Sequence, residues 1–345
     1  MATVYFKAID SYSKTKEISA AGRFLLERLV EKEKVELSKK IPLKVHFGEK
    51  GNITYLSADN YDGIIDYLDE NEISTFYTDT NVLYSGQRMT RDKHIKLAKD
   101  HGFTRVPVVI ADGDHGNDFD EVTIDEKHFK RCKVGKLIGD HDQLLIIAHF
   151  KGHMLSGFGG AIKQLGMGCA ARGGKLTMHH SSKPKIVRRK CNNCGTCAKQ
   201  CPVDAIYVKG KAHRIDLDKC VGCASCIAVC PVKAAKVRWT SINLFKTFGE
   251  RLAEYALAAQ KDKRNIYMTF VFNITRGCDC MGRKMKIILP DLGVFASTDP
   301  VAIDQACLDL IDKRAGKKKF GGRHLLEYAE KIGLGTRKYK LVKVD

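Results

Sequence analysis

Eight of the thirteen cysteines lie between Cys191 and Cys230 and repeat one spacing twice. Each copy places three cysteines two residues apart, then a fourth after three more residues, directly followed by proline. Zinc sites use pairs of cysteines at a longer separation, and disulfides are rare where a compartment keeps thiols reduced. The spacing therefore predicts two [4Fe–4S] clusters, because three closely spaced thiolates reach three irons of one cube.

The fourth cysteine of each copy opens a short helix that points away from its own loop, so it reaches the other cube. We therefore assign Cys191, Cys194, Cys197 and Cys230 to one cluster. We assign Cys220, Cys223, Cys226 and Cys201 to the other. Residues 188–238 resemble the bacterial two-cluster ferredoxin family, and the resemblance implies electron transfer through the clusters. A purely structural role for the clusters is the alternative.

Outside residues 188–238, strand-like and helix-like segments alternate. This alternation predicts an α/β fold with a largely parallel sheet and flanking helices, interrupted by an inserted α+β two-cluster ferredoxin-like module. Residues 1–187 would form the first part of the α/β domain, 188–238 the module, and 239–345 the second part. Two tandem domains flanking the module are the alternative. Expected strands are Thr3–Ile9, Pro42–Phe47, Thr75–Thr80, Val106–Ala111, Leu144–Phe150, Ile266–Phe272, Met285–Leu289 and Lys340–Val344. The expected helices include Glu17–Glu31, with Phe24, Leu25 and Leu29 on its apolar face, Leu244–Ala259 and Leu325–Ile332.

A glycine-rich segment follows the predicted strand that ends at Phe150. Gly157, Gly159 and Gly160 precede a predicted helix, and glycines at such a place expose backbone N–H groups that hold a phosphate or carboxylate. The pattern is neither a Walker loop nor a dinucleotide fingerprint, and a tight packing turn is the alternative. Just before it, the segment His149-Phe-Lys151-Gly-His153 offers two histidines and a lysine.

The sequence Cys278-Asp279-Cys280 follows the predicted strand Ile266–Phe272 within a polar loop. Loops at the carboxyl ends of parallel strands carry the chemistry of α/β folds. Two thiols one residue apart suit a metal, with Cys169 or a histidine as a further ligand, or a redox pair. Buried inert cysteines are the alternative. We expect a third metal ion here, with Cys169, Cys278, Cys280, His149 and His153 as candidate ligands.

Several further polar residues are candidates for the same pocket. Asp299 and Pro300 are typical of a helix start, which leaves Asp304 one turn later for another role. His46, Glu49 and Asp79 close predicted strands, and His179-His180 is a histidine pair of low specificity.

These segments together resemble the domain of unknown function 362 family, which is described as iron–sulfur centre proteins. The residues that carry the resemblance are the stretch 149–153, the stretch Gly157–Cys169, Cys278–Cys280 and the stretch that starts at Ser297. The resemblance implies an α/β fold and cluster binding across nearly the whole chain, and it implies no particular reaction.

We expect an oxidoreductase that passes electrons through the clusters to a small anionic substrate. Lys151 would hold the anionic group, and Asp279 or Asp304 would handle protons. A non-enzymatic electron carrier or cluster-binding adaptor is the alternative. The formal net charge of +19 favours an acidic redox partner of the ferredoxin or flavodoxin type, and a lysine-rich solvated surface with no partner is the alternative.

No motif of the recognised DNA or RNA modules is present, so nucleic acid is not an expected partner. The sequence shows no signal peptide and no apolar run of about 18 residues, so we expect no membrane association and a cytoplasmic location.

Overall fold

The computed structural model describes residues 1–179, 183–237 and 244–344. Its centre is an eight-stranded sheet in which β15 runs antiparallel to both neighbours while the other pairings are parallel. In spatial order the strands are β16 (Tyr339–Val344), β1 (Ala2–Ala8), β15 (Gly293–Ser297), β14 (Ile266–Val271), β7 (Leu145–His149), β2 (Lys40–Lys44), β3 (Ser74–Asp79) and β4 (Val108–Ile110). The α/β fold with a largely parallel sheet is therefore confirmed.

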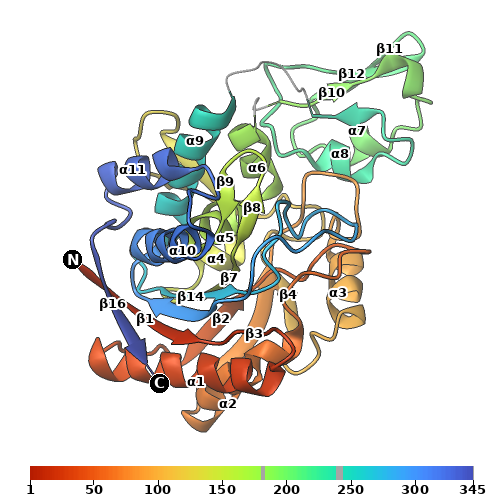
Figure 1. The fold of residues 1–345 in the computed structure, drawn as a ribbon. Coiled ribbons are helices and arrows are strands. Elements are labelled where there is room, and N and C mark those ends of the chain that lie inside the picture. Colours follow the sequence, from red (N-terminus) through yellow and green to blue (C-terminus); the bar gives the residue numbers. More distant parts are fainter. Residues whose placement is uncertain (180–182, 238–243, 345) are drawn as a thin grey trace.

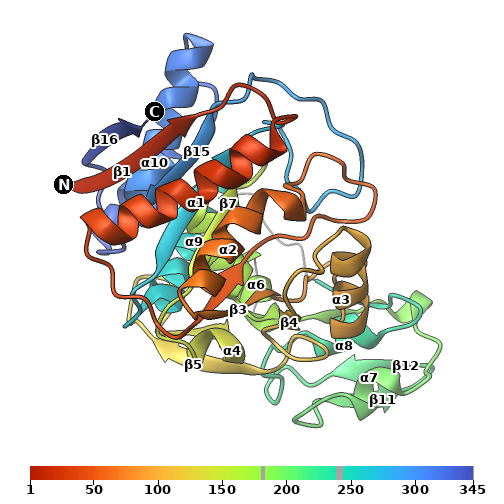
Figure 2. The same ribbon diagram turned by 90° about the horizontal axis from the view of Figure 1, so that it is seen from below.

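Helices cover both faces of this sheet (Figures 1 and 2). α1 (Thr15–Lys32) and α2 (Asp62–Glu70) lie on one face. α5 (Ala161–Cys169), α9 (Leu244–Gln260), α10 (Pro300–Ala315) and α11 (Arg323–Lys331) lie on the other. Because successive side chains of a strand point to opposite faces, Tyr267 enters the core under α9 and α10 while Met268 enters the core under α1 and α2. The sheet thus separates two apolar cores.

The sequence before and after the module builds one and the same sheet. β7 precedes the module and β14 follows it, yet they pair in parallel with Leu145 opposite Ile266. β1 and β16, near the two ends of the described chain, also lie side by side (Figure 1).

The module lies beside the carboxyl ends of the central strands (Figure 1). Its elements are β10 (Lys185–Ile186), α7 (Thr196–Lys199), β11 (Ile206–Lys209), β12 (Ala212–Ile215), α8 (Ser225–Val229) and β13 (Ala235–Lys236). Gly173 in α6 lies so close to the second cysteine loop that a Cβ there would be 2.7 Å from the Gly222 carbonyl oxygen. The module is therefore packed tightly against the α/β body at α6.

The remaining elements are shorter and connect the sheet to its surroundings. They are η1 (Ala58–Tyr61), α3 (Arg91–Asp100), β5 (Phe119–Thr123), β6 (Arg131–Gly135), α4 (Lys136–Gly139), β8 (Lys151–His153), β9 (Gly157–Gly159), α6 (Arg172–His179) and η2 (Arg188–Lys190). None of the helices in the described parts of the chain is long and apolar enough to cross a membrane.

Two expectations at the level of single elements were wrong. Met285–Leu289 is not a strand: Ile287 is 47% exposed and makes only an isolated bridge with Thr275. The sheet instead uses β15, which the sequence analysis missed. Phe24, expected on the buried face of α1, is 38% exposed and lies under the Lys7 ammonium, because it is a third of a turn away from buried Leu25.

Candidate functional site

A cavity of about 390 Å³ lies between the sheet and the module. Asp79 at the end of β3 and His46 just after β2 line it from the body. Ile227 and Val237 line it from the module. The cavity thus lies at the carboxyl ends of parallel strands, where α/β folds bind their ligands.

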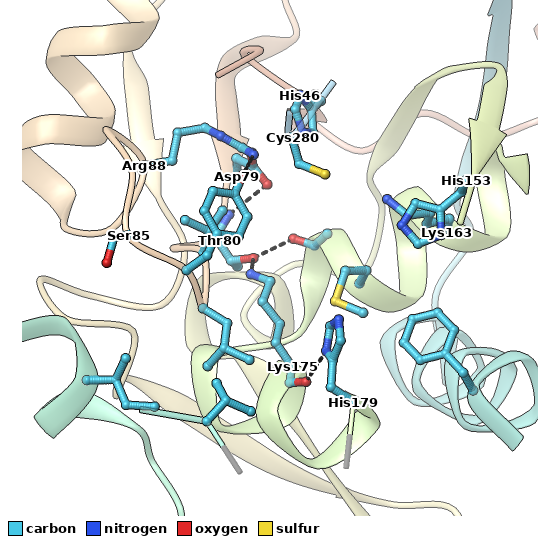
Figure 3. Close-up of a pocket in the computed structure, with 18 of the residues that line it drawn as sticks. His46, Asp79, Thr80, Ser85, Arg88, His153, Lys163, Lys175, His179 and Cys280 are labelled. Carbon is cyan, nitrogen blue, oxygen red and sulfur yellow. Dashed lines mark hydrogen bonds and ion pairs between the residues drawn. The ribbon is translucent and has the colours of Figure 1, made fainter. Parts of the chain in front are cut away.

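Most charged groups that reach this cavity are cations (Figure 3). Arg88, Lys163 and Lys175 come from the α/β body, while Lys233 and Lys236 come from the module. Lys175 is buried and its Nζ donates to the Thr80 hydroxyl and, at 2.7 Å, to the Asn81 carbonyl. Burial lowers the pKa of Lys175 to about 8. The sequence analysis missed Arg88, Lys163 and Lys175.

The acidic group on the cavity wall is Asp79, and it is already neutralised. The Lys44 Nζ lies 2.9 Å from Asp79 Oδ1, and the Arg88 guanidinium lies 3.3 Å from Oδ2. Burial would raise the pKa of Asp79, but Lys44, His94 and Arg88 outweigh it and hold the pKa well below its usual range. Glu49 lies behind Arg88, with its Oε2 3.6 Å from the Arg88 Nε. The cavity therefore keeps an excess of positive charge.

Two histidines of the cavity, His46 and His153, have lowered pKa values and are neutral. Burial and the Arg88 charge lower the pKa of His46 well below its usual range, and the Gly48 N–H donates to its Nδ1 at 3.0 Å. Burial and Lys163 lower the pKa of His153 to about 3. The Ser156 N–H donates to His153 Nδ1 at 3.1 Å, so the ring proton is on Nε2. His179 also lines the cavity, whereas His180 lies outside the described residues.

The loop Cys278-Asp279-Cys280 brings one thiol to the cavity and keeps the other behind it. Cys280 lines the cavity next to His46, whereas Cys278 is 3% exposed (Figure 3). The Lys163 Nζ donates to Cys278 Sγ at 3.5 Å, and the Cys280 backbone N–H donates to the same sulfur at 3.4 Å. A hydrogen bond from the Cys280 thiol, helped by Lys163, holds the pKa of Cys278 well below its usual range. The same hydrogen bond and burial raise the pKa of Cys280.

Asp279 points away from the cavity and joins His149 to Lys151. Its Oδ2 accepts from Lys151 Nζ at 2.6 Å and lies 2.9 Å from His149 Nδ1. His149 Nε2 faces the Phe272 carbonyl at 2.7 Å, so both ring nitrogens of His149 face oxygen acceptors. Burial would raise the pKa of Asp279, but His149 and Lys151 hold it well below its usual range.

The glycine segment surrounds a carboxylate of the chain itself. Asp304 Oδ1 accepts from the Ala161 N–H at 2.7 Å, and its Oδ2 accepts from the Ile162 N–H at 3.0 Å. A Cβ on Gly160 would lie 2.1 Å from Asp304 Oδ1, and one on Gly157 would lie 2.3 Å from the Gly321 backbone. The N–H groups that the sequence offered to an external anion are thus taken by Asp304. Gly159 has more room: its Cβ would lie 3.3 Å from the Lys163 side chain.

The candidate ligands of a third metal do not converge. Cys169 ends α5 inside the apolar core, where burial raises its pKa to about 11. His149 is held by Asp279 rather than by a thiol. Within residues 1–179, 183–237 and 244–344, no group of three or more His, Cys, Asp or Glu side chains is placed to hold a metal ion.

The eight cysteines of the module line two further, smaller cavities. The first is lined by Cys191, Cys194, Cys197 and Cys230. The second is lined by Cys201, Cys220, Cys223 and Cys226. Each group takes three thiols from one repeat and the fourth from the other, which is the crossed grouping that the sequence predicts for two clusters.

The two repeats also share an unusual backbone. Three positions in each repeat have positive φ, and the positions correspond. The matched pairs are Asn193 and Gly222, Gly195 and Ala224, and Asp204 and Lys233. The fourth cysteines match as well: Cys201 Sγ accepts from the Ala205 N–H at 3.3 Å, and Cys230 Sγ accepts from the Ala234 N–H at 3.1 Å. Left-handed residues turn N–H groups toward one side, and such groups stabilise thiolate charge.

A single residue separates the module's cysteines from the cationic cavity. Ala235 lines both that cavity and the first four-cysteine cavity. Ala235 also packs with Cys197 and Cys226 in one small apolar cluster. Nothing in an alanine marks it as functional, so this contact could not be predicted from the sequence.

Comparisons with known proteins place the chain in a family. The family model DUF362, described as a domain of unknown function, matches residues 41–309, which include the cavity and the module. No curated protein matches the chain.

Two solved structures have a distant likeness. The crystal structure of a protein from Thermotoga maritima has a TM-score of 0.40 and 13% identity, and the match covers 92% of this chain and 58% of that one. The lactate racemase apoprotein from Thermoanaerobacterium thermosaccharolyticum has a TM-score of 0.35 and 11% identity, covering 78% of this chain and 50% of that one. The matches thus span about half the length of these proteins.

Proposed function

Because the chain belongs to the DUF362 family, which is described as a domain of unknown function, we propose its function from the chemistry of the site. We propose an iron–sulfur oxidoreductase that passes electrons through two [4Fe–4S] clusters to a small anionic substrate in the cationic cavity. The observation that carries the proposal is the position of Ala235, which lines both the cavity and one four-cysteine group.

The residues present fit two clusters. Each small cavity is surrounded by four thiols, and each repeat turns backbone N–H groups inward through matched left-handed residues. When bound, such clusters accept and donate electrons one at a time. Ala235 and Ile227 are apolar residues that line the cavity and also pack against Cys197 and Cys226 of the module.

The cavity residues suit an anion with an apolar part. Arg88, Lys163 and Lys175 supply positive charge, and Met167 and Phe248 supply apolar wall. Neutral His153 presents its Nε2–H as a proton donor, a role that suits an imidazole near neutral pH. Lys151, expected to hold the anion, is instead paired with Asp279, so we propose that this pair positions the Cys278–Cys280 loop.

The partner is proposed to be an acidic ferredoxin or flavodoxin type of protein. The module's outer surface carries exposed lysines, and Cys194 is exposed there as well. The basic residues there are Lys190, Lys199, Lys209, Lys211, Arg214, Lys219 and Lys233. Opposite charge steers such a partner toward the module and makes the encounter rate sensitive to salt.

Metal analysis tests the cluster part of the proposal. Iron, sulfide and zinc are measured on protein purified without oxygen and on the Cys278→Ser/Cys280→Ser double variant. We expect about eight irons and eight sulfides per chain in both samples. Protein that contains zinc but no iron would contradict the cluster part of the proposal. An additional metal that is lost in the double variant would establish the third site at Cys278 and Cys280.

Ligand binding tests the substrate part. Calorimetry with phthalate, a small aromatic dianion, measures binding to the cavity in the cluster-loaded protein. Lys175→Met should weaken binding roughly tenfold, the equivalent of about 1.4 kcal/mol. Lys96→Met, which removes a 75%-exposed lysine paired only with Asp100, is the control and should leave binding unchanged. If wild-type protein binds no small anion, the electron-carrier alternative replaces the enzyme.

A further inference from the structure

We propose that Cys278 and Cys280 form a redox-active dithiol–disulfide pair that exchanges with small anionic disulfides bound in the cationic cavity. This inference deepens the proposed function and rests on it for the supply of electrons. Its basis is the geometry of the two sulfurs and of the charges around them.

The two thiols occupy different places. Cys280 reaches the cavity and is positioned to attack a bound molecule, while Cys278 lies directly behind it. The Cys280 N–H donates to Cys278 Sγ at 3.4 Å, so the loop is folded tightly enough to bring the second sulfur next to the first. This is the arrangement of an attacking thiol and a resolving thiol.

The surroundings of the pair differ from those of the inert cysteines. The Lys163 Nζ lies 3.5 Å from Cys278 Sγ, and a neighbouring ammonium stabilises the thiolate, which is the nucleophilic form. Cys307 and Cys169, in contrast, are buried in the apolar core between helices and sheet. A metal is the other use of paired thiols, but the described residues place no third ligand in range of a shared ion.

The cavity selects the class of partner. Arg88, Lys163 and Lys175 line the same cavity as Cys280, each from a different direction (Figure 3), and attract negative charge into it. Met167 and Phe248 offer an apolar surface on which an organic group can lie. A disulfide with carboxylates near the sulfurs meets both requirements.

The chemistry balances without further reagents. The Cys278 thiolate takes the proton of the Cys280 thiol, Cys280 Sγ attacks one sulfur of the substrate, a mixed disulfide forms, and one substrate thiolate leaves. Cys278 then attacks Cys280 Sγ, the Cys278–Cys280 bond closes, and the second substrate thiolate leaves; the one proton that the thiol–thiolate pair held goes to a substrate thiolate. Two electrons, passed one at a time from the clusters of the proposed function, and one proton reopen the bond and restore the thiol–thiolate pair.

The test uses 5,5′-dithiobis(2-nitrobenzoate), an aromatic disulfide that carries two carboxylates, on cluster-loaded protein without oxygen. Peptide mass analysis after alkylation reports the state of each cysteine. In wild-type protein we expect a closed Cys278–Cys280 bond and no adduct on that peptide. In Cys278→Ser we expect a stable mixed disulfide on Cys280, because the resolving thiol is absent. Lys163→Met should slow the reaction roughly tenfold, since the ammonium that stabilises the thiolate is gone.

Cys307→Ala is the matched control, because it removes a buried thiol remote from the cavity and should change neither product. The proposal is overturned if wild-type Cys278 and Cys280 both remain alkylatable, or if both carry adducts with no bond between them. Iron content is measured on the same samples. If the protein contains its full iron but the Cys278–Cys280 bond does not form, the dithiol proposal is contradicted and the cluster proposal is not. If the bond forms in protein without iron, the cluster proposal is contradicted and the dithiol proposal is not.

Discussion

The module and the Cys278–Cys280 loop both gather thiols, but the chain specifies the two sites in different ways. In the module the thiols are close in sequence, and a short repeat with matched left-handed residues brings each group of four together. In the loop the decisive partner, Lys163, is 115 residues away from Cys278 and is brought there by α5. The module's thiols are thus brought together by local spacing, which suits a bound group of fixed shape. The reactivity of the Cys278–Cys280 loop depends instead on a charge that the tertiary fold supplies.

The surroundings of the two sites differ as well. The module's thiols lie near small apolar residues such as Ala235. The cavity side of the body holds a buried network of charges around Asp79, with Lys44 and Arg88 as partners. We infer that the module depends on its bound group for stability, whereas the body is held by its own ion pairs. The following predictions test this contrast.

The largest effect is expected from pairs of cysteine substitutions in the module. If the ligands are crossed, Cys191→Ser/Cys230→Ser removes two ligands of one cluster and leaves about four irons per chain. Cys191→Ser/Cys201→Ser removes one ligand from each cluster and leaves close to none. Both double variants lose two thiols, so each is the control for the other. Equal iron contents in the two variants would contradict the crossed assignment.

A large effect is also expected in the body, from its ion network rather than from its thiols. Lys44→Met leaves buried Asp79 without its nearest cation, which destabilises folding by about 3–5 kcal/mol. Urea unfolding followed by circular dichroism measures the difference. Lys96→Met breaks an exposed pair and should cost less than about 0.5 kcal/mol. Comparable losses in the two variants would show that burial of the Asp79 network contributes little.

Some parts of the fold and of the candidate site could be predicted from the sequence, and others could not. The eight cysteines that we propose as cluster ligands could be predicted because their spacing is local, and the strand at Leu144–Phe150 because it is continuously apolar. The apolar run Met285–Leu289 was misleading, since hydrophobicity alone does not distinguish a strand from a loop segment lying over the surface. Lys163 and Ala235 were missed because their roles depend on which distant element they face.

The body should also respond to pH through Asp304. Burial raises the pKa of Asp304 from its usual 3.8 to about 7 despite the two N–H groups that it accepts from. Between these two values the folded chain binds more protons than the unfolded chain, so stability falls as pH rises and levels off above about 7. Asp304→Asn should remove this decline, which amounts to about 1 kcal/mol per pH unit.

Urea unfolding between pH 5.5 and 8 compares wild type with Asp304→Asn. The difference in unfolding free energy should shrink toward pH 5.5, where the wild-type carboxyl is protonated and resembles the amide. A difference that is constant across this range would mean that Asp304 is charged throughout.

The smallest effect is expected at Gly195, and it separates the two regions most directly. Gly195 and Gly157 both have positive φ, but a Cβ on Gly195 would meet nothing within 4 Å, whereas one on Gly157 would lie 2.3 Å from the Gly321 backbone. Gly195→Ala should therefore cost only the left-handed backbone strain, about 1 kcal/mol, and leave the iron content unchanged. Ala224 already adopts this conformation at the matching position of the second repeat.

Gly157→Ala should destabilise folding several-fold more than Gly195→Ala, because the neighbouring backbone must shift. The thermal unfolding midpoints of the two variants measure the ratio. Loss of iron in Gly195→Ala would mean that the first cysteine loop, unlike the second, has no tolerance for a side chain there.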